Sequence, residues 1–218
     1  AHAQDFPPGF PGREGEGQVR VELASPLPVF FRLEALPSAP LGLVPRALSG
    51  VAWGRSQRTL ALPYAYRRRG LHPVRLSFGL QSPLGFGKRV LVLEAGQVLV
   101  YPALRALPPY RPAPSLFLEG RAAAFGLPDP LHIDTQSLHP GYLDHAASLA
   151  TWLLLQAEAR GERFGLSAGE VLPLGRGKAH LNRALALLAL LAPTPGPALP
   201  PPAPWGSTYL LLTQGAED

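Results

Sequence analysis

Apolar and polar residues alternate along most of the first half of the chain. Val19, Val21 and Leu23, for example, are separated by the charged residues Arg20 and Glu22. Such alternation places apolar side chains on one face of an extended strand and polar side chains on the other. Strands of this kind are predicted at residues 19–23, 29–33, 60–66, 74–80, 89–94 and 97–101. Several short strands joined by turns that contain proline and glycine predict an antiparallel β-sandwich.

We place this β-sandwich at residues 18–102. Residues 1–17 are rich in proline and glycine and show no periodicity, so we interpret them as a flexible leading segment. Pro63 lies within a predicted strand and indicates an edge strand, because proline cannot donate to a neighbouring strand. Ala95 and Gly96 are predicted to form a tight turn between the last two strands.

The second half of the chain alternates between helical and strand patterns. Helices are predicted at residues 140–160 and 178–192, and short strands at residues 131–134, 163–166, 170–172 and 209–212. The apolar residues that share one helical face are Leu143, Ala146, Ala147, Ala150, Leu153, Leu154 and Ala157 in the first helix and Leu181, Ala184, Leu185 and Leu188 in the second. Pro140 suits the start of a helix and Gly161 its end. Residues 130–218 are therefore predicted to form an α/β domain with a mainly parallel sheet, and residues 103–129 a linker.

Three short motifs in the first half resemble a known family. They are RRRG at residues 67–70, SPLGF at residues 82–86 and VYP at residues 100–102. In this order they resemble the middle of a bacterial family known as domain of unknown function 58. The RFGL strand at residues 163–166 and the LPLGRGKAHL segment at residues 172–181 are also similar to that family. The resemblance implies an N-terminal antiparallel β-sandwich followed by a von Willebrand factor A-like α/β domain.

One departure from this family is large. Its members carry REYRPGD and IHWKASAR motifs before the first strand of the α/β half, and neither occurs between Pro114 and Pro130. Either this protein has lost the block, or residues are missing from the sequence at this point. The abrupt and poorly patterned join at residues 120–125 favours the second alternative.

The amino-acid composition limits the kinds of partner and site that the protein can have. The net charge of +5 comes almost entirely from arginine, since lysine occurs only at Lys88 and Lys178. Arginine pairs readily with carboxylates and phosphates, although an arginine bias is also typical of proteins from GC-rich genomes. The absence of cysteine excludes disulfides and thiolate metal sites. Missing cysteine and methionine, asparagine at Asn182 alone and proline-rich loops are compatible with a protein from a thermophile.

A von Willebrand-type metal site is predicted to be degraded in this sequence. The resemblance implies an Asp-x-Ser-x-Ser motif after the first strand of the α/β domain and an Asp in a later Thr-Asp-Gly turn. Asp134 is retained, but Gln136 and Leu138 replace the two serines and Gln214 replaces the later aspartate. Hard cations need several oxygen ligands, so we expect no metal there and interpret Asp134 as a capping residue.

No catalytic constellation is found, and we expect no enzymatic activity. Residues 175–178 (GRGK) are similar to part of a phosphate-binding loop, but Ala179 stands where Ser or Thr must hold Mg²⁺. A glycine turn before a helix explains these residues without a nucleotide. His139 and His145 are six residues apart, which is not the spacing of a helical zinc pair.

Arg67, Arg68 and Arg69 form the densest charge cluster and are the candidate interaction residues. They could bind an acidic protein surface or lipid phosphates, or they could be a solvated loop that keeps the protein soluble. Aromatic residues are not interleaved with the cluster, as they are on surfaces that bind single-stranded nucleic acid. We therefore expect a protein partner and no nucleic acid.

The family resemblance also implies a setting for the protein. Members have a membrane hairpin before the sandwich and are encoded beside MoxR-type AAA+ ATPases. By this analogy the chain is the cytoplasmic part of a membrane-anchored assembly factor that works with such an ATPase. Its own longest apolar run, residues 184–192, is too short to span a bilayer. The alternative is an extracytoplasmic, metal-dependent adhesion or ligand-binding module.

Overall fold

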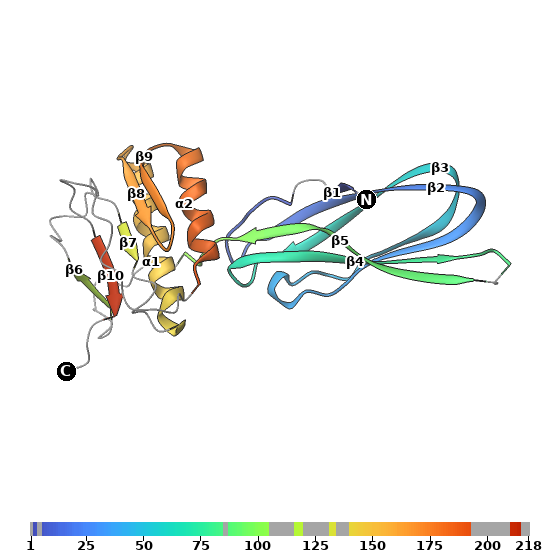
Figure 1. Cartoon of the computed structure of the whole chain (residues 1–218), viewed down its shortest axis with the longest axis horizontal. Helices are drawn as coiled ribbons and strands as arrows, with labels where there is room; N and C mark the ends of the chain where they lie inside the picture. The colour runs from blue at the N-terminus through green and yellow to red at the C-terminus, as the bar shows by residue number, and fades with distance from the viewer. Residues whose placement is uncertain are drawn as a thin grey trace. The chain divides into compact units, whose positions relative to one another are not determined.

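The computed structural model describes residues 2–3, 6–84, 87–104, 116–119, 131–133, 140–192 and 210–214 (Figure 1). The chain divides into two compact units, Ala1–Val100 and Tyr101–Asp218. The first is built from β-strands, and the second combines strands with helices. We call them the β unit and the α/β unit and describe each by itself.

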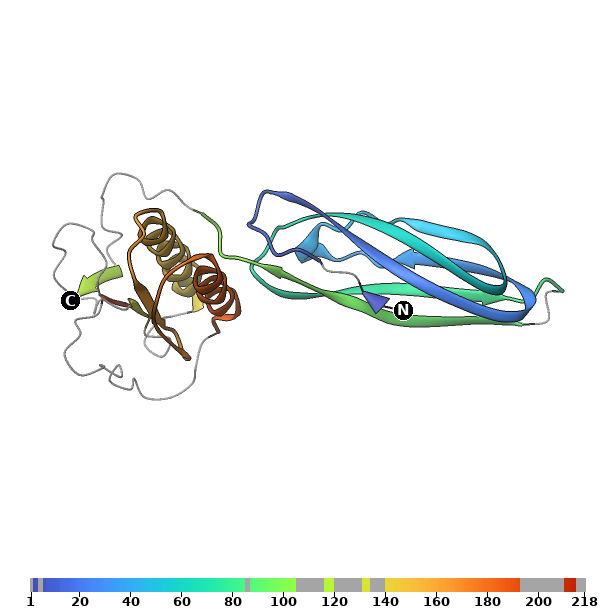
Figure 2. The ribbon, with the colours of Figure 1, turned by 90° about the horizontal axis from the view of Figure 1, so that it is seen from above.

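The strands of the β unit are all antiparallel. They are β1 (His2–Ala3), β2 (Glu14–Ala35), β3 (Ala47–Ala65), β4 (Gly70–Gln81) and β5 (Lys88–Val100), and a short 3₁₀ helix (Ala39–Leu41) lies between β2 and β3. The sheet order is β1-β2-β4-β5, with β3 paired to β2. The unit is therefore made of two long hairpins, β2–β3 and β4–β5, which lie one above the other in Figure 2.

The buried side chains of both hairpins form one core. Val19, Val21 and Leu23 of β2 are buried, whereas Arg20 and Glu22 between them are exposed, as the alternating pattern predicts. The same cluster includes residues from β3, β4 and β5, among them Leu62, Leu76 and Val98. A core enclosed between two antiparallel layers is sandwich-like, which confirms the predicted architecture of the first half of the chain.

β2 is one long bent strand rather than the two strands expected at residues 19–23 and 29–33. Its pairing with β3 shifts register between Ser25 and Val29. Pro26 and Pro28 lie in this interval, and neither has an N–H to donate to β3. Beyond the bend, β2 pairs with β3 on one side and β4 on the other, so the bend lets one strand contribute to both layers.

The prediction of a tight turn at Ala95 and Gly96 is wrong, because β5 continues through both residues. Val74 of β4 pairs with Gly96 and Arg75 pairs with Glu94, which leaves Ala95 as an extra residue in β5. This is a β-bulge, and Gly96 adopts a φ of 153° that suits glycine. A glycine beside a small residue marks a bulge as readily as a turn, so the sequence pattern was ambiguous here.

The leading segment is more ordered than the expected flexible stretch at residues 1–17. β2 already begins at Glu14, and before it the N–H of Gly9 donates to the carbonyl oxygen of Leu99 (3.2 Å). The N–H of Gly12 donates to the carbonyl oxygen of Tyr66 (2.9 Å). The proline- and glycine-rich segment therefore binds to the ends of β3 and β5 through its backbone.

The α/β unit contains one mixed sheet. Its elements are β6 (Leu116–Glu119), β7 (Leu131–Ile133), α1 (Pro140–Ala159), β8 (Phe164–Ser167), β9 (Val171–Gly175), α2 (Lys178–Leu190) and β10 (Leu210–Gln214). The strand order is β6-β10-β7-β8-β9. β7 is parallel to β8 and β10, whereas β6 and β9 are antiparallel to their neighbours.

Both predicted helices are confirmed, and so are their buried stripes. Every apolar residue assigned to the two stripes is less than 9% exposed. α1 begins at Pro140 and ends before Gly161, which has a φ of 71° and donates its N–H to the carbonyl oxygen of Glu158 (2.9 Å). Left-handed glycine is a common way to end a helix.

Two expectations for the α/β unit need correction. Residues 116–119, assigned to the linker at 103–129, form β6 and pair with β10. The sheet is also less parallel than expected, because β8 and β9 are joined by a short turn at Ala168–Glu170 that can link only antiparallel strands. A four-residue strand among prolines carries too little periodicity to be recognised from sequence.

Candidate functional site

The three consecutive arginines lie in the turn from β3 to β4, which we call the arginine turn (residues 67–69). The N–H groups of Arg67 and Arg68 both donate to the carbonyl oxygen of Pro40, at 3.1 and 3.2 Å. His72 donates from Nε2 to the carbonyl oxygen of Arg68 at 2.7 Å. The turn is therefore tied by its backbone to the 3₁₀ loop and to β4.

The side chains of the arginine turn face outward. Arg67 and Arg68 are exposed and Arg69 is half-buried. Arg67 runs beside Gly42, where an added Cβ would lie 2.6 Å from the Nε of Arg67. Gly42 also has a φ of 49°, so glycine serves there both for its conformation and for its small size. Guanidinium groups held in this way can bind carboxylates or phosphates through paired N–H donors.

Two tyrosines precede the arginine turn, one at the end of β3 and one directly after it. Tyr64 and Tyr66 are both buried, and their rings meet edge to face at 5.2 Å. The Tyr66 hydroxyl donates to the carbonyl oxygen of Pro7 (2.8 Å). Burial raises the pKa of the Tyr64 hydroxyl well above its usual value, and the hydrogen bond to Tyr66 adds to this. The hydrogen bond from Tyr66 therefore helps to hold the leading segment against the end of β3.

Arg13 is a further cationic residue beside the arginine turn that the sequence reasoning missed. Its carbonyl oxygen accepts the N–H of Tyr66 (3.0 Å), the residue immediately before the turn, and its side chain is exposed. The register that pairs Glu14 with Ala65 brings Arg13 there. Because a register between strands so distant in sequence is not readable from either segment alone, no local signal could have identified this residue.

The GRGK segment has a structural explanation. Gly177 precedes α2 with a φ of 94°, and its N–H donates to a carboxylate oxygen of Glu158 from α1 (3.1 Å). An anion at the start of α2 would meet this carboxylate, which already occupies a favourable position beside the helix N-terminus. Gly175 is needed for space, because an added Cβ would lie 2.6 Å from the His180 ring. These contacts give Gly175 and Gly177 a structural role.

Of the residues assigned to a degraded metal site, the structure describes only Gln214. Asp134, Gln136 and Leu138 lie outside the described residues, and Gln214 is the last residue of β10. Among the residues that the structure does describe, no group of three or more His, Asp or Glu could hold a metal ion. His72 and His180 instead donate to backbone carbonyl oxygens, which gives both a structural role.

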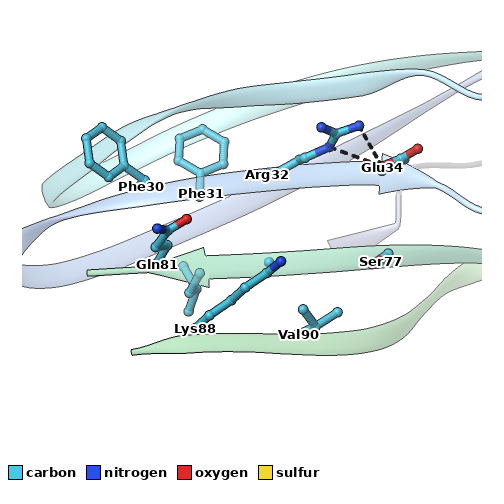
Figure 3. A pocket seen from close by; sticks show the side chains of 10 residues that line it. Phe30, Phe31, Arg32, Glu34, Ser77, Gln81, Lys88 and Val90 are labelled. Carbon is cyan, nitrogen blue, oxygen red and sulfur yellow. Dashed lines mark hydrogen bonds and ion pairs between the residues drawn. The ribbon is translucent and has the colours of Figure 1, made fainter. Parts of the chain in front are cut away.

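A shallow hollow of about 440 Å³ lies on the outer face of the β unit, over β2, β4 and β5 (Figure 3). Arg32 and Glu34 of β2 form an ion pair at 3.0 Å along one side, and Lys88 and Val90 of β5 line the other. Gly79 of β4 lies between Arg32 and Val90 in the register and has no side chain, which accounts for the depression. The hollow offers a mixed apolar and charged surface rather than an enclosed cavity.

No protein family model and no curated protein matches the chain. Among solved structures, the chain is similar to the ASH / PapD-like domain of human CEP192, with 14% identity and a TM-score of 0.34 over 46% of this chain and 80% of that one. Within the described residues, no helix combines the length and apolar character needed to cross a bilayer.

Proposed function

We propose that this chain is a non-catalytic protein-interaction module whose β unit presents the arginine turn to an acidic surface of a partner protein. The observation that carries the proposal is the backbone anchoring of the turn at Pro40 and His72, with Arg67 and Arg68 exposed. A loop that is ordered before binding loses less conformational entropy when a partner docks. Exposed turns on a rigid sheet are common recognition sites.

The partner that we propose is a MoxR-type AAA+ ATPase. This rests on the resemblance of residues 67–70, 82–86 and 100–102 to the family known as domain of unknown function 58. The same resemblance supports a membrane-anchored protein whose soluble part is cytoplasmic. Arginine-rich surfaces attract acidic partners over distances of about 10 Å, the range at which salt screens charge at moderate ionic strength.

The α/β unit is proposed to be von Willebrand factor A-like. Its strand order supports this, because the chain passes from β7 outward to β8 and β9 and then returns to place β10 on the other side of β7. In open α/β sheets, ligands bind where the strand order reverses in this way, at the carboxyl ends of the strands. β7 ends at Ile133, so Asp134 follows at the position where such a site would begin.

We expect no divalent cation to bind at this position, because Gln136, Leu138 and Gln214 remove oxygen ligands that the site requires. Titration with Mg²⁺ or Mn²⁺ should leave the melting temperature unchanged, since a ligand that binds the folded state raises it in a saturable way. A saturable rise that disappears in Asp134→Ala would contradict this expectation. It would favour a metal-dependent ligand-binding module instead.

The interaction itself is tested by reversing the charge of the arginine turn. The triple variant R67E/R68E/R69E should bind a purified MoxR-type AAA+ ATPase at least about tenfold more weakly than the unchanged protein, mainly through slower association. Raising the salt concentration should weaken binding of the ATPase by the unchanged protein in the same way. Biolayer interferometry at two ionic strengths measures both effects.

A matched control separates the turn from net charge. Arg20, Arg55 and Arg58 are exposed on β2 and β3, so R20E/R55E/R58E makes the same charge change away from the turn. This control should retain most of the binding. Circular dichroism should show that both variants fold, since surface substitutions usually change stability by less than about 0.5 kcal/mol. The arginine turn would be ruled out as the interaction site if both triple variants bound the ATPase equally well, whether or not their affinity was lower than that of the unchanged protein.

A further inference from the structure

The first part of β5, residues 88–94, is an unusual edge strand. It pairs with β4 along one edge, and within the described part of the chain no strand pairs along its other edge. Val90, Leu91 and Val92 at its centre are 54%, 37% and 63% exposed. Its apolar side chains are thus accessible, and β1, which contacts β5, pairs with β2 rather than with this edge.

Such an edge is a template for pairing with another strand. Proteins usually protect edges with proline, central charges or bulges. Here the first bulge comes at Ala95, after this segment, and the charges stand only at its ends, with Lys88 and Arg89 at one and Glu94 at the other. The unprotected stretch is about as long as an average strand, which is long enough to form a ladder with a second chain.

The sequence of this edge is complementary to itself. When two copies pair antiparallel about a two-fold axis at Leu91, Lys88 stands opposite Glu94 of the second copy, and Val90 stands opposite Val92. Lys88, Val90, Val92 and Glu94 have the same parity and therefore share the outer face of the sheet, where Lys88 and Val90 line the hollow. Every position on this face meets a chemically matched residue, and each charge pair occurs twice.

Other registers lack this match. A two-fold axis keeps outer-face residues opposite outer-face residues, so the axis must pass through a residue, and the nearest alternatives are Val90 and Val92. An axis at Val90 places Lys88 opposite Val92, and an axis at Val92 places Glu94 opposite Val90. On the outer face, both alternatives bring a charge against an apolar side chain, whereas the register centred on Leu91 does so only on the inner face, where Arg89 meets Leu93. Opposite charges and paired β-branched residues stabilise neighbouring strands, which favours the register centred on Leu91.

We propose that the chain forms a two-fold symmetric dimer through antiparallel pairing of residues 88–94 of β5. The interface is isologous, with the same strand used by both copies. The sheet order β3-β2-β4-β5, seen in part in Figure 3, continues into the second copy from β5 to β4, β2 and β3. The pairing covers the apolar residues Val90 and Val92 and satisfies the exposed backbone groups of both edges.

Dimerisation through β5 leaves the arginine turn accessible. Gly70, at the end of that turn, pairs with Val100, whereas Lys88 pairs with Gln81 at the opposite end of the β4–β5 hairpin. A dimer would therefore present two arginine turns, which raises the apparent affinity for a partner with repeated sites. The dimer itself requires no such partner.

Charge reversal at the two ends of the segment tests the pairing and its register. The unchanged chain should show a concentration-dependent dimer in the micromolar range by sedimentation equilibrium. K88E places two glutamates opposite one another twice per dimer, and E94K does the same with lysines. Each substitution should raise the dimer Kd by about tenfold or more, because like charges directly opposite destabilise paired strands. K88E is the cleaner variant, since Glu94 stands opposite Arg75 of β4 in the register and its carboxylate accepts a hydrogen bond from Gln97 (3.1 Å).

Mixing the two variants gives the decisive measurement. In the mixed dimer, Glu at position 88 of one chain meets Lys at position 94 of the other, and the unaltered Glu94 and Lys88 meet at the second pair. The mixture should therefore recover a dimer close to that of the unchanged protein, which damage to the fold of either variant cannot explain. Arg58→Glu on β3, an exposed charge reversal away from β5, should leave the dimer unchanged.

Three results would overturn the proposal. One is a monomer throughout the micromolar range. Another is a dimer that neither K88E nor E94K weakens, which would place a different surface at the interface. The third is a dimer that both variants weaken but that mixing fails to restore, since this would exclude the register centred on Leu91. If β5 instead pairs with a different protein, the purified chain should be a monomer. That outcome would overturn the proposal in the same way as the first result.

Discussion

Replacing Leu33 with alanine is expected to lower the free energy of unfolding by about 2–5 kcal/mol, the usual cost of truncating a fully buried leucine. Leu33 is 1% exposed and lies on β2 where the sheet is widest, opposite Leu48 of β3 and Phe78 of β4. Its removal leaves a cavity between two pairs of strands that cannot close without moving their backbones. Urea denaturation followed by circular dichroism in the β-sheet region measures the loss.

Leu27→Ala is the matched control for this prediction. Leu27 lies on the same strand, at the bend, and is 70% exposed. Its truncation removes the same atoms without creating a cavity, and the change in the free energy of unfolding should stay within about 0.5 kcal/mol. Similar losses from Leu33→Ala and Leu27→Ala would contradict the placement of the core between the two hairpins.

Much of the β unit could be predicted from sequence, because half-buried strands leave a period of two. Val19, Val21 and Leu23 are buried as their alternation indicates. The sequence pattern did not show, however, that β2 and β5 each continue as a single strand. β2 passes through two prolines and β5 through a glycine without ending, because tertiary pairing holds the backbone extended on either side of a local irregularity. Residues that usually mark turns therefore marked a bend and a bulge.

The first part of β3 was missed for a related reason. Residues 47–59 have a polar and glycine-containing pattern, and Val51 and Trp53 are both exposed. Their strand is held by its pairing with β2 rather than by an apolar face of its own. Edge strands of this kind carry a weak hydrophobic period, so their sequences resemble loops.

The charged residues of the candidate site could be predicted from the sequence, but the contacts that hold the arginine turn in place could not. Arg67, Arg68 and Arg69 are adjacent in sequence, so the cluster is visible at once. The groups that fix it are distant in sequence: Pro40 accepts two of its backbone hydrogen bonds, and Arg13 lies beside it through the pairing of β2 with β3. The self-complementary order of β5 was likewise present in the sequence, but it gained meaning only when the structure showed which edge is open.

Phe164→Ala is expected to have the largest effect in the α/β unit, with a loss of about 3–5 kcal/mol in the free energy of unfolding. Phe164 is fully buried at the start of β8, and its ring lies 4.9 Å from the ring of His180 on α2. Its carbonyl oxygen also accepts the hydrogen bond from His180 Nε2 (3.0 Å). Truncation would remove the ring contact between strand and helix and leave a cavity, while the backbone hydrogen bond could persist.

Phe164→Leu provides the control, because leucine fills much of the same volume and should cost less than about 1.5 kcal/mol. The two variants can be compared by chemical denaturation followed at 222 nm, where the α/β unit contributes through α1 and α2. A loss from Phe164→Ala no greater than that from Phe164→Leu would mean that the ring does not hold β8 against α2. The proposed von Willebrand-like arrangement, in which β8 is parallel to β7 and α2 follows β9, would then lose its main packing support.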